Sequence, residues 1–283
     1  MEIKRVGIVG SGIMGSGIAE VAAGAGFEVI LRSRAQSSAD RMVAGLEKSL
    51  ARQVEKGKLD DAERAAVLGR VSAVTDLGEL AECDLVIESI VEDLATKKHL
   101  FNELDRICHS GTILATNTST LPVVEMAMES RPDQVCGIHF FNPAPMMPLV
   151  EVVRAITSSD ETVETARQFA EACGKSPVTV RDQAGFIVNA LLFPYLNNAV
   201  KLLDAEVASR DDIDAAMKGG CNFPMGPLEL LDLVGLDTSL AILEALYAEF
   251  RDPNYAPAPL LRRMVGAERL GRKTRRGFYD YHR

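Results

Sequence analysis

The stretch Val6-Gly7-Ile8-Val9-Gly10-Ser11-Gly12-Ile13-Met14-Gly15 decides the fold of the first part of this chain. It opens with an apolar, mostly β-branched run that is typical of a buried strand. The glycines that follow have the spacing G-x-G-x-x-G, and the last of them lies inside Ile13–Ala25, a stretch with the pattern of a helix. A glycine-rich turn that joins a strand directly to a helix is the context in which this spacing indicates a dinucleotide-binding turn.

Each glycine of this turn has its own physical reason. Gly10 permits the tight turn, Gly12 lets the backbone approach a pyrophosphate, and Gly15 lets the helix pack against the strand. The amino terminus of the helix then faces the anion. The alternative is a glycine-rich turn without a ligand. We expect the cofactor-binding residues of the turn to be Gly10, Ser11, Gly12, Ile13, Met14 and Gly15.

The residues that end the second predicted strand bear on which dinucleotide is bound. An NAD site usually has an acid there, which accepts a hydrogen bond from the ribose 2′-hydroxyl. This chain reads Leu31-Arg32-Ser33-Arg34 and offers no carboxylate before Asp40. Two guanidinium groups suit a dianionic 2′-phosphate. We therefore expect Arg32, Ser33 and Arg34 to favour NADP(H), with NAD(H) as second choice; the alternative is that both arginines are solvated charges.

Short β-branched runs alternate with longer helical stretches up to about Phe140. This alternation predicts an α/β fold, with a Rossmann-type, mostly parallel sheet and helices on both faces. A charged helical segment, about residues 39–68 with a break at Gly57, is expected to project from the sheet. The predicted strands are Arg5–Val9, Glu28–Leu31, Asp84–Glu88, Thr112–Ala115 and Val135–Phe140, and the helices between them include Ile13–Ala25 and Ala95–Cys108.

The pattern changes after Asp182, because no strand-like run follows while helical stretches continue. Ile187–Leu203 and Leu240–Phe250 look helical, and Ser209 supplies a capping signal for a helix at Asp211–Lys218. We therefore expect a dinucleotide-binding domain over residues 1–183 and an all-helical C-terminal domain over residues 184–283.

The composition of the 283 residues is that of an ordinary globular protein, 47% hydrophobic and 25% charged, with a net charge of −9. The acidic balance argues against nucleic acid or an anionic membrane as a partner. No apolar run reaches the ~18 residues that a membrane-spanning helix needs, and the early first strand leaves no room for a signal peptide. The five cysteines lack metal-ligand spacing, so we expect reduced thiols, a cytoplasmic location and no metal site.

A second informative segment, Gly137-Ile138-His139-Phe140-Phe141-Asn142-Pro143, is followed by the apolar run Leu149–Val153. His139 ends a strand at the carboxyl edge of the predicted sheet, where ligands bind in open α/β folds. Glu151 lies inside the next apolar run, and the prolines between favour a rigid reversal that brings the two strands together. A buried carboxylate needs a partner, and a carboxylate-oriented histidine is a common acid/base unit. The alternative is a structural histidine.

Two further polar groups interrupt apolar sequence. Ser119 lies in Thr116–Thr120, again after a predicted strand, where a helix cap is the plainer interpretation. Asn189 lies within an otherwise apolar helix. Its amide must find partners, which are either structural groups or a substrate oxygen.

Together these motifs resemble those of the L-3-hydroxyacyl-CoA dehydrogenase family, and within it the short, single-function 3-hydroxybutyryl-CoA dehydrogenases. They occur in the same order over nearly the whole chain, which is more specific than any one motif. The segments that carry the resemblance are Gly10–Gly15, Glu92 with Lys97, Asn117–Ser119, His139–Pro143, Leu149–Val152, Gly185–Asn189, Pro224–Pro227, Gly271–Lys273 and Gly277–Tyr279.

The resemblance implies an oxidoreductase that interconverts a 3-ketoacyl-CoA and its (S)-3-hydroxyacyl-CoA. By residue match, His139 is the general acid/base, Glu151 orients it, and Ser119 and Asn189 contact the reacting oxygen. The match also implies a homodimer formed through the helical domain, with Asn222–Leu231 as a candidate contact. Nicotinamide-side contacts fall on Glu92, Lys97, Asn117, Asn142 and Lys273, and coenzyme A contacts on Ser49 and Lys56.

The chain departs from the family pattern at Ser33, where NAD-using relatives have the ribose-binding aspartate, and also at Thr120 and Ala190. The departure at Ser33 supports NADP(H), which would suit synthesis of butyrate-type products; NAD⁺ would suit fatty-acid breakdown. The alternatives are a related hydroxyacid or sugar-acid dehydrogenase and a non-catalytic nucleotide-binding protein. The His139–Glu151 arrangement argues against hydroxyacid dehydrogenases that use a lysine, and the complete catalytic set argues against a non-catalytic protein.

Overall fold

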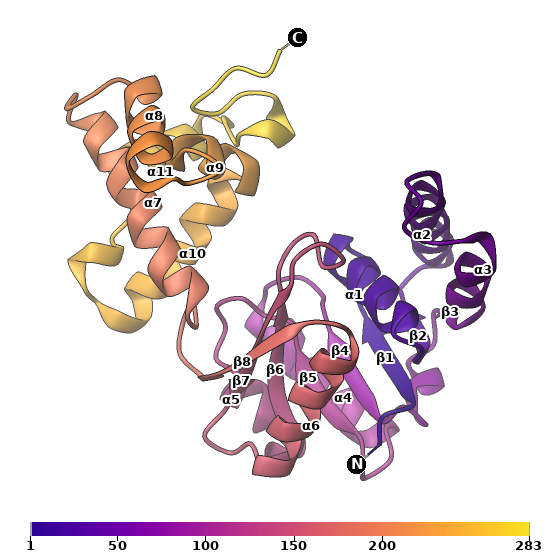
Figure 1. Cartoon of the computed structure of the whole chain (residues 1–283). Coiled ribbons are helices and arrows are strands. Elements are labelled where there is room, and N and C mark those ends of the chain that lie inside the picture. Colours follow the sequence, from indigo (N-terminus) through magenta and orange to yellow (C-terminus); the bar gives the residue numbers. More distant parts are fainter. Residues whose placement is uncertain (1, 283) are drawn as a thin grey trace. The chain divides into compact units, whose positions relative to one another are not determined.

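The computed structural model describes residues 2–282 of the chain and divides into two compact units (Figure 1). The first unit ends at Asp182 and the second begins at Gln183. The first is built on a single sheet flanked by helices, and the second is helical. The predicted α/β fold followed by a helical part is therefore confirmed.

The sheet of the first unit has eight strands in the order β3-β2-β1-β4-β5-β6-β7-β8. Its neighbouring strands are parallel except for β6 and β7, which are antiparallel. The sheet is thus mostly parallel, as the alternation of strands and helices predicts. Its strands are β1 (Arg5–Val9), β2 (Glu28–Arg32), β3 (Val71–Val74), β4 (Leu85–Glu88), β5 (Ile113–Thr116), β6 (Val135–Phe140), β7 (Leu149–Arg154) and β8 (Ser176–Arg181).

Several helices of the first unit begin at a capping side chain. Asp93 accepts a hydrogen bond from Thr96 N at the start of α4, and Asp60 forms a capping box with Glu63 at the start of α3. The helical segment predicted with a break at Gly57 is present as two helices, α2 and α3, and Gly57 lies between them at a φ of +66°. The helices are α1 (Ile13–Gly24), α2 (Gln36–Glu55), α3 (Asp61–Gly69), α4 (Leu94–Ile107), α5 (Val123–Ala127) and α6 (Asp160–Ala172), with 3-10 helices at Leu77–Leu80 and Pro132–Gln134.

The central strands position the loops that matter for function. Every residue of β4, β5 and β6 is buried, which fixes these strands firmly in the core. Because the strands from β2 to β6 run in parallel, their carboxyl ends meet at one edge of the sheet. The segments that leave this edge are Gly10–Gly15, Arg32–Arg34, Ser89–Asp93, Asn117–Thr120 and Phe141–Pro148.

The second unit packs its helices around an apolar core that includes Leu196, Leu231 and Leu243, all fully buried. Two buried aspartates tie its segments together. Asp214 accepts hydrogen bonds from the first N–H groups of α9, and Asp232 accepts them from the C-terminal tail. The helices are α7 (Val188–Asp204), α8 (Arg210–Cys221), α9 (Pro227–Val234), α10 (Leu236–Phe250) and α11 (Pro259–Gly266), with 3-10 helices at Pro253–Tyr255 and Arg272–Thr274.

Two strands, β3 and β8, fall outside the stretches that the sequence pattern marks as strands. They lie at the two ends of the sheet, and none of their residues is fully buried. An outer strand that is only partly buried lacks the apolar run by which a central strand is recognised. The other predicted elements are present. The strands β1 and β6 have the predicted bounds, whereas the ends of the others are shifted; α10, for example, begins at Leu236 rather than Leu240. Ser209 caps α8, as predicted.

Within residues 2–282, no helix is both long and apolar enough to cross a bilayer. The same residues contain no cluster of three or more His, Cys, Asp or Glu side chains that could hold a metal ion. All five cysteines are free thiols.

Candidate active site

The turn between β1 and α1 has the geometry of an anion-binding turn. Gly10 has a φ of +135°, and a Cβ atom there would lie 2.2 Å from the carbonyl oxygen of Ser89. A Cβ at Gly15 would lie 2.1 Å from the carbonyl oxygen of Gly10, so both positions require glycine. Gly12 has nothing within 4 Å of its Cβ position and no side-chain cap. The first N–H groups of α1 therefore face open space from which a phosphate can approach.

The end of β2 combines two arginines with a buried serine. Arg32 donates from Nε to the carbonyl oxygen of Thr75 at 3.1 Å, and Arg34 is exposed. Ser33 is 2% exposed, yet its hydroxyl has no hydrogen-bond partner among the described residues. A buried hydroxyl without a partner is unfavourable unless a ligand or water supplies one.

A cavity of about 500 Å³ lies beside the glycine turn. Ser11 and Gly12 line it from the turn, Ser49 from α2, and Asn142 from the loop after β6. The carboxylate of Glu20, which also lines it, accepts a hydrogen bond from Gln53 at 2.7 Å. Burial raises the pKa of Glu20, although hydrogen bonds from Ser49 and Gln53 oppose the shift. Both α1 and α2 therefore contribute polar side chains to the cavity, Glu20 from the first and Ser49 from the second.

His139 and Glu151 form the central pair of the site. They lie directly opposite each other in the antiparallel register of β6 and β7, and His139 Nδ1 is 2.8 Å from Glu151 Oε2. Glu151 is fully buried and His139 is 6% exposed. The reversal expected from the proline-rich loop thus places both side chains on one face of the sheet, and the ring of Phe141 packs 4.5 Å from the imidazole. A carboxylate at Nδ1 makes that nitrogen a donor and leaves proton exchange to Nε2.

The loop after β5 is held by hydrogen bonds on both sides. Asn117 Oδ1 accepts a hydrogen bond from Phe140 N at 2.8 Å, which fixes the loop to the strand that carries His139. Glu92 Oε1 accepts hydrogen bonds from Ser119 N at 3.0 Å and from Ser119 Oγ at 3.3 Å. The helix-cap interpretation of Thr116–Thr120 is wrong, because Asp182, far along the chain, supplies the cap of α5.

A buried charge cluster lies behind this loop. Lys97, which is 1% exposed, contacts Glu88 at 2.6 Å and Glu92 at 3.3 Å. Glu88 is fully buried and also accepts a hydrogen bond from Thr116 Oγ1 at 2.7 Å. Lys97 and Glu92, which the resemblance places at the cofactor, therefore belong to one network with Ser119.

The remaining predicted site residues occupy varied environments. Asn142 is exposed and is followed by a cis peptide bond to Pro143. Lys56 is exposed at the end of α2. In the second unit, Asn189 is 8% exposed on α7, and Lys273 lies 2.5 Å from Asp237.

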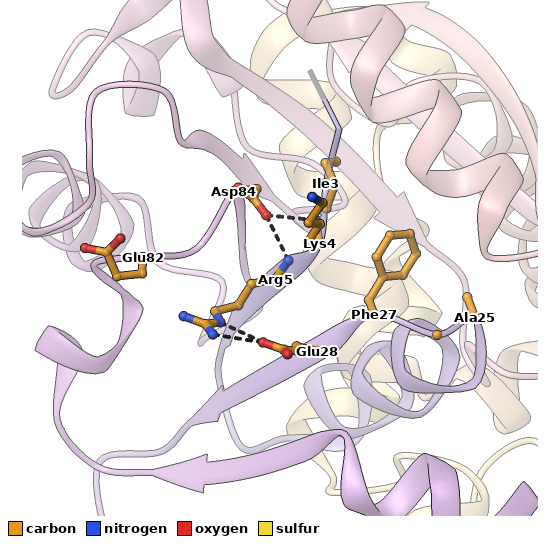
Figure 2. Close-up of a pocket in the computed structure, with 9 residues that line it drawn as sticks. Ile3, Lys4, Arg5, Ala25, Phe27, Glu28, Glu82 and Asp84 are labelled. Atoms are coloured by element: carbon orange, nitrogen blue, oxygen red, sulfur yellow. Dashed lines mark hydrogen bonds and ion pairs between the residues drawn. The ribbon is translucent and has the colours of Figure 1, made fainter.

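A further cavity, of about 530 Å³, lies at the opposite edge of the sheet, where β1, β2 and β4 begin (Figure 2). Three of its charged side chains have partners at this edge. Arg5 pairs with Glu28 at 2.9 Å, and Asp84 accepts hydrogen bonds from the backbone of Lys4 and Arg5. The predicted strand begins at Asp84, whereas β4 begins one residue later, at Leu85. The carboxylate of Asp84 bonds to the backbone at the start of β1 and so joins the amino ends of β1 and β4.

Sequence reasoning missed Glu88 and Glu20 as members of the site. Glu88 could have been noticed, because an acid that ends an apolar strand at the carboxyl edge is as unusual as His139 at the end of β6. Glu20 had no such signal, since an acid within a helix is ordinarily a solvated side chain.

Comparison with known proteins covers both units. The profile of the 3-hydroxyacyl-CoA dehydrogenase NAD-binding domain matches residues 5–183, and that of the C-terminal domain of the same family matches residues 185–281. The chain is 48% identical over 280 residues to a 3-hydroxybutyryl-CoA dehydrogenase of Clostridioides difficile, covering 99% of this chain and 100% of that protein. It is 42% identical over 288 residues to the mitochondrial hydroxyacyl-coenzyme A dehydrogenase of Sus scrofa, covering 99% and 91%.

Among solved structures, the (S)-3-hydroxybutyryl-CoA dehydrogenase of Ralstonia eutropha superposes with a TM-score of 0.97 at 42% identity, covering 100% of both chains.

Proposed function

The chain belongs to the 3-hydroxyacyl-CoA dehydrogenase family and is an oxidoreductase that acts on a CH–OH group, and we propose that it interconverts acetoacetyl-CoA and (S)-3-hydroxybutyryl-CoA. Similarity to the enzymes of C. difficile and R. eutropha along their whole length supports this substrate pair. The observation that carries the proposal is the buried pair of His139 and Glu151 at the ligand-binding edge of the sheet.

The family uses a nicotinamide cofactor, and the residues of the first unit fit one. The open side of Gly12 admits a pyrophosphate, and the buried hydroxyl of Ser33 lacks a partner where the ribose is expected. We assign the nicotinamide-side contacts to Glu92, Lys97, Asn117, Asn142 and Lys273.

When bound, the nicotinamide supplies the hydride chemistry. The protein handles the proton: His139 Nε2 donates it to the developing alkoxide in reduction and accepts it from the substrate hydroxyl in oxidation. Glu151 holds the ring through Nδ1 and stabilises the imidazolium. Ser119 and Asn189 donate hydrogen bonds that strengthen as negative charge builds on the reacting oxygen.

The coenzyme A chain is assigned to α2 and the residues that follow it. Ser49 lines the cavity beside the glycine turn, and Lys56 is exposed near the end of the helix. Lysines there suit the phosphates of coenzyme A despite the acidic balance of the whole chain.

NADP(H) is the proposed cofactor, with NAD(H) as second choice. Arg32 and Arg34 flank Ser33 at the end of β2, and no carboxylate is present there to accept a hydrogen bond from an unmodified ribose. Arg32 donates to the carbonyl oxygen of Thr75 through Nε, so its two terminal guanidinium nitrogens can bind a phosphate.

The second unit is the proposed dimerisation domain. Phe223 and Leu233, which lie in and beside Asn222–Leu231, are 43% and 49% exposed. Exposed apolar side chains of this size are typical of an interface. Sedimentation analysis of the protein and of a Phe223→Asp variant tests the proposal, since a dimer unaffected by the charge would exclude this contact.

The function is tested by following nicotinamide absorbance with acetoacetyl-CoA and comparing kcat/KM for NADPH and NADH. Turnover that favours NADPH supports the substrate and the cofactor together. Turnover that favours NADH supports the substrate and refutes the cofactor preference. Nucleotide binding without turnover of acetoacetyl-CoA refutes the proposed substrate and directs the search to longer acyl chains and sugar acids.

A further inference from the structure

We propose that Glu88 is a positioning residue for the reaction: through Lys97 and Glu92 it fixes the loop that presents Ser119 to the substrate oxygen. The inference rests on the proposed function, because the role of Ser119 does.

Glu88 is the anchor of the cluster. It ends β4, its side chain is fully buried, and both carboxylate oxygens are bonded. Oε1 accepts hydrogen bonds from Lys97 Nζ and Ile90 N, each at 2.6 Å, and Oε2 accepts one from Thr116 Oγ1 at 2.7 Å. Glu88 and Thr116 are partners in the register of two central strands. The carboxylate is therefore fixed between two buried central strands of the sheet.

Lys97 transmits this position to the loop. It is buried on α4, and its ammonium group lies between Glu88 and Glu92. Burial acts to raise the pKa of Glu92, but Lys97 and the hydrogen bonds from Thr118 and Ser119 outweigh it, so that the pKa lies below its ordinary value. Glu92 is therefore ionised at neutral pH and attracted toward Lys97.

Glu92 in turn organises the residues around Ser119. Its Oε1 accepts hydrogen bonds from Thr118 Oγ1 at 2.6 Å and from Ser119 N at 3.0 Å. Because the Glu92 side chain is 39% exposed, water competes for its carboxylate, and the ion pair with Lys97 adds to these hydrogen bonds in holding it inward. The contact to Ser119 Oγ is long, 3.3 Å. In the proposed function this hydroxyl contacts the substrate oxygen, whereas the backbone N–H of the same residue is held by Glu92.

The next residue of α4 provides a matched control. Lys98 contacts Glu125 at 3.1 Å and Glu129 at 3.2 Å, and all three side chains are at least one-third exposed. These ion pairs have the same chemistry on the same helix but lie at the surface rather than in the buried cluster. A surface pair of this kind contributes little, so Glu125→Gln should leave turnover unchanged.

A double-mutant cycle on the full-length protein tests the proposal. With acetoacetyl-CoA and saturating cofactor, Glu88→Gln is expected to lower kcat about tenfold, within the range for a group that aids alignment, with little change in KM for acetoacetyl-CoA. In a Ser119→Ala background, Glu88→Gln should cause almost no further loss, because its effect passes through Ser119. A merely structural effect of Glu88 would multiply with that of Ser119→Ala, and this outcome would overturn the proposal.

If Glu88→Gln does not fold, Thr116→Val is the substitute, since it removes one hydrogen bond to Glu88 at nearly constant shape. Thr116→Val should lower kcat by less than Glu88→Gln does, and in the Ser119→Ala background it should cause almost no further decrease in kcat. Undiminished turnover in a folded Glu88→Gln protein also overturns the inference. An unmodified protein that fails to reduce acetoacetyl-CoA refutes the proposed function instead, so the two failures are distinguishable.

Discussion

Replacing Glu151 by glutamine is the most direct test of the acid/base pair, because it keeps the shape of the side chain and removes its charge. Glu151 Oε2 lies 2.8 Å from His139 Nδ1, and the carboxylate is fully buried. Water therefore cannot take its place beside the imidazole. In the Glu151→Gln variant, the protonated form of His139 loses its charged partner.

The size of the effect follows from this geometry. A hydrogen bond to a charged group contributes about 1.5–3 kcal/mol, which corresponds to a loss of about 10–10²-fold at 1.36 kcal/mol per factor of ten. A glutamine amide can also donate to Nδ1, which places the ring proton on Nε2 and blocks proton acceptance. The loss of proton acceptance adds to the loss of the charged partner. Since general acid/base catalysis contributes about 10²–10⁴-fold, we expect kcat of Glu151→Gln to be lower than that of the parent by about this factor.

The assay is steady-state oxidation of the reduced cofactor with acetoacetyl-CoA, alongside thermal unfolding of each variant. His139→Gln should lose as much activity as Glu151→Gln, and the double variant should lose no more than either, because the two residues act as a unit. Asp214→Asn is a control for burial: Asp214 is 2% exposed in the second unit, and its loss should lower stability and leave kcat unchanged. A folded Glu151→Gln protein with near-parental kcat, beside an inactive His139→Gln protein, would refute the orienting role.

Gly10→Ala is expected to abolish nucleotide binding, measured by fluorescence titration with NADPH, because its Cβ would lie 2.2 Å from Ser89 O at a φ of +135°; normal affinity would contradict the assigned turn. Replacing Arg32 and Arg34 by neutral residues should raise KM for NADPH and leave KM for NADH nearly unchanged, whereas equal losses would remove the 2′-phosphate argument. The pKa of Glu92 is lowered in the folded protein, since Lys97 and its hydrogen bonds outweigh burial. Its contribution to stability is therefore present above its ordinary pKa of 4.5 and is lost as pH falls through the lowered value. The parent protein should accordingly melt at a higher temperature than Glu92→Gln at neutral pH, and this difference in melting temperature should shrink below about pH 4.5. A difference that stays constant down to acid pH would count against the pairing of Glu92 with Lys97.

The sequence determined the parts of the protein that depend on neighbouring residues. The glycine turn, the strand before it and the helix after it are specified within Val6–Ala25. The pairing of His139 with Glu151 could also be predicted, because a proline-rich reversal between two apolar runs allows few arrangements. The hairpin of α2 and α3 followed from helical periodicity and the break at Gly57.

Only the tertiary structure decided which distant side chains meet. Glu88, Lys97 and Ser119 belong to different elements, and no local pattern indicates that one network joins them. The cap of α5 comes from Asp182 rather than from the residues before the helix. The outer strands β3 and β8 owe their structure to pairing with neighbours, since neither has a fully buried residue. The physical reason is the same in each case: periodicity and turn chemistry act within a few residues, whereas charge pairing and strand pairing depend on packing that brings separate segments together.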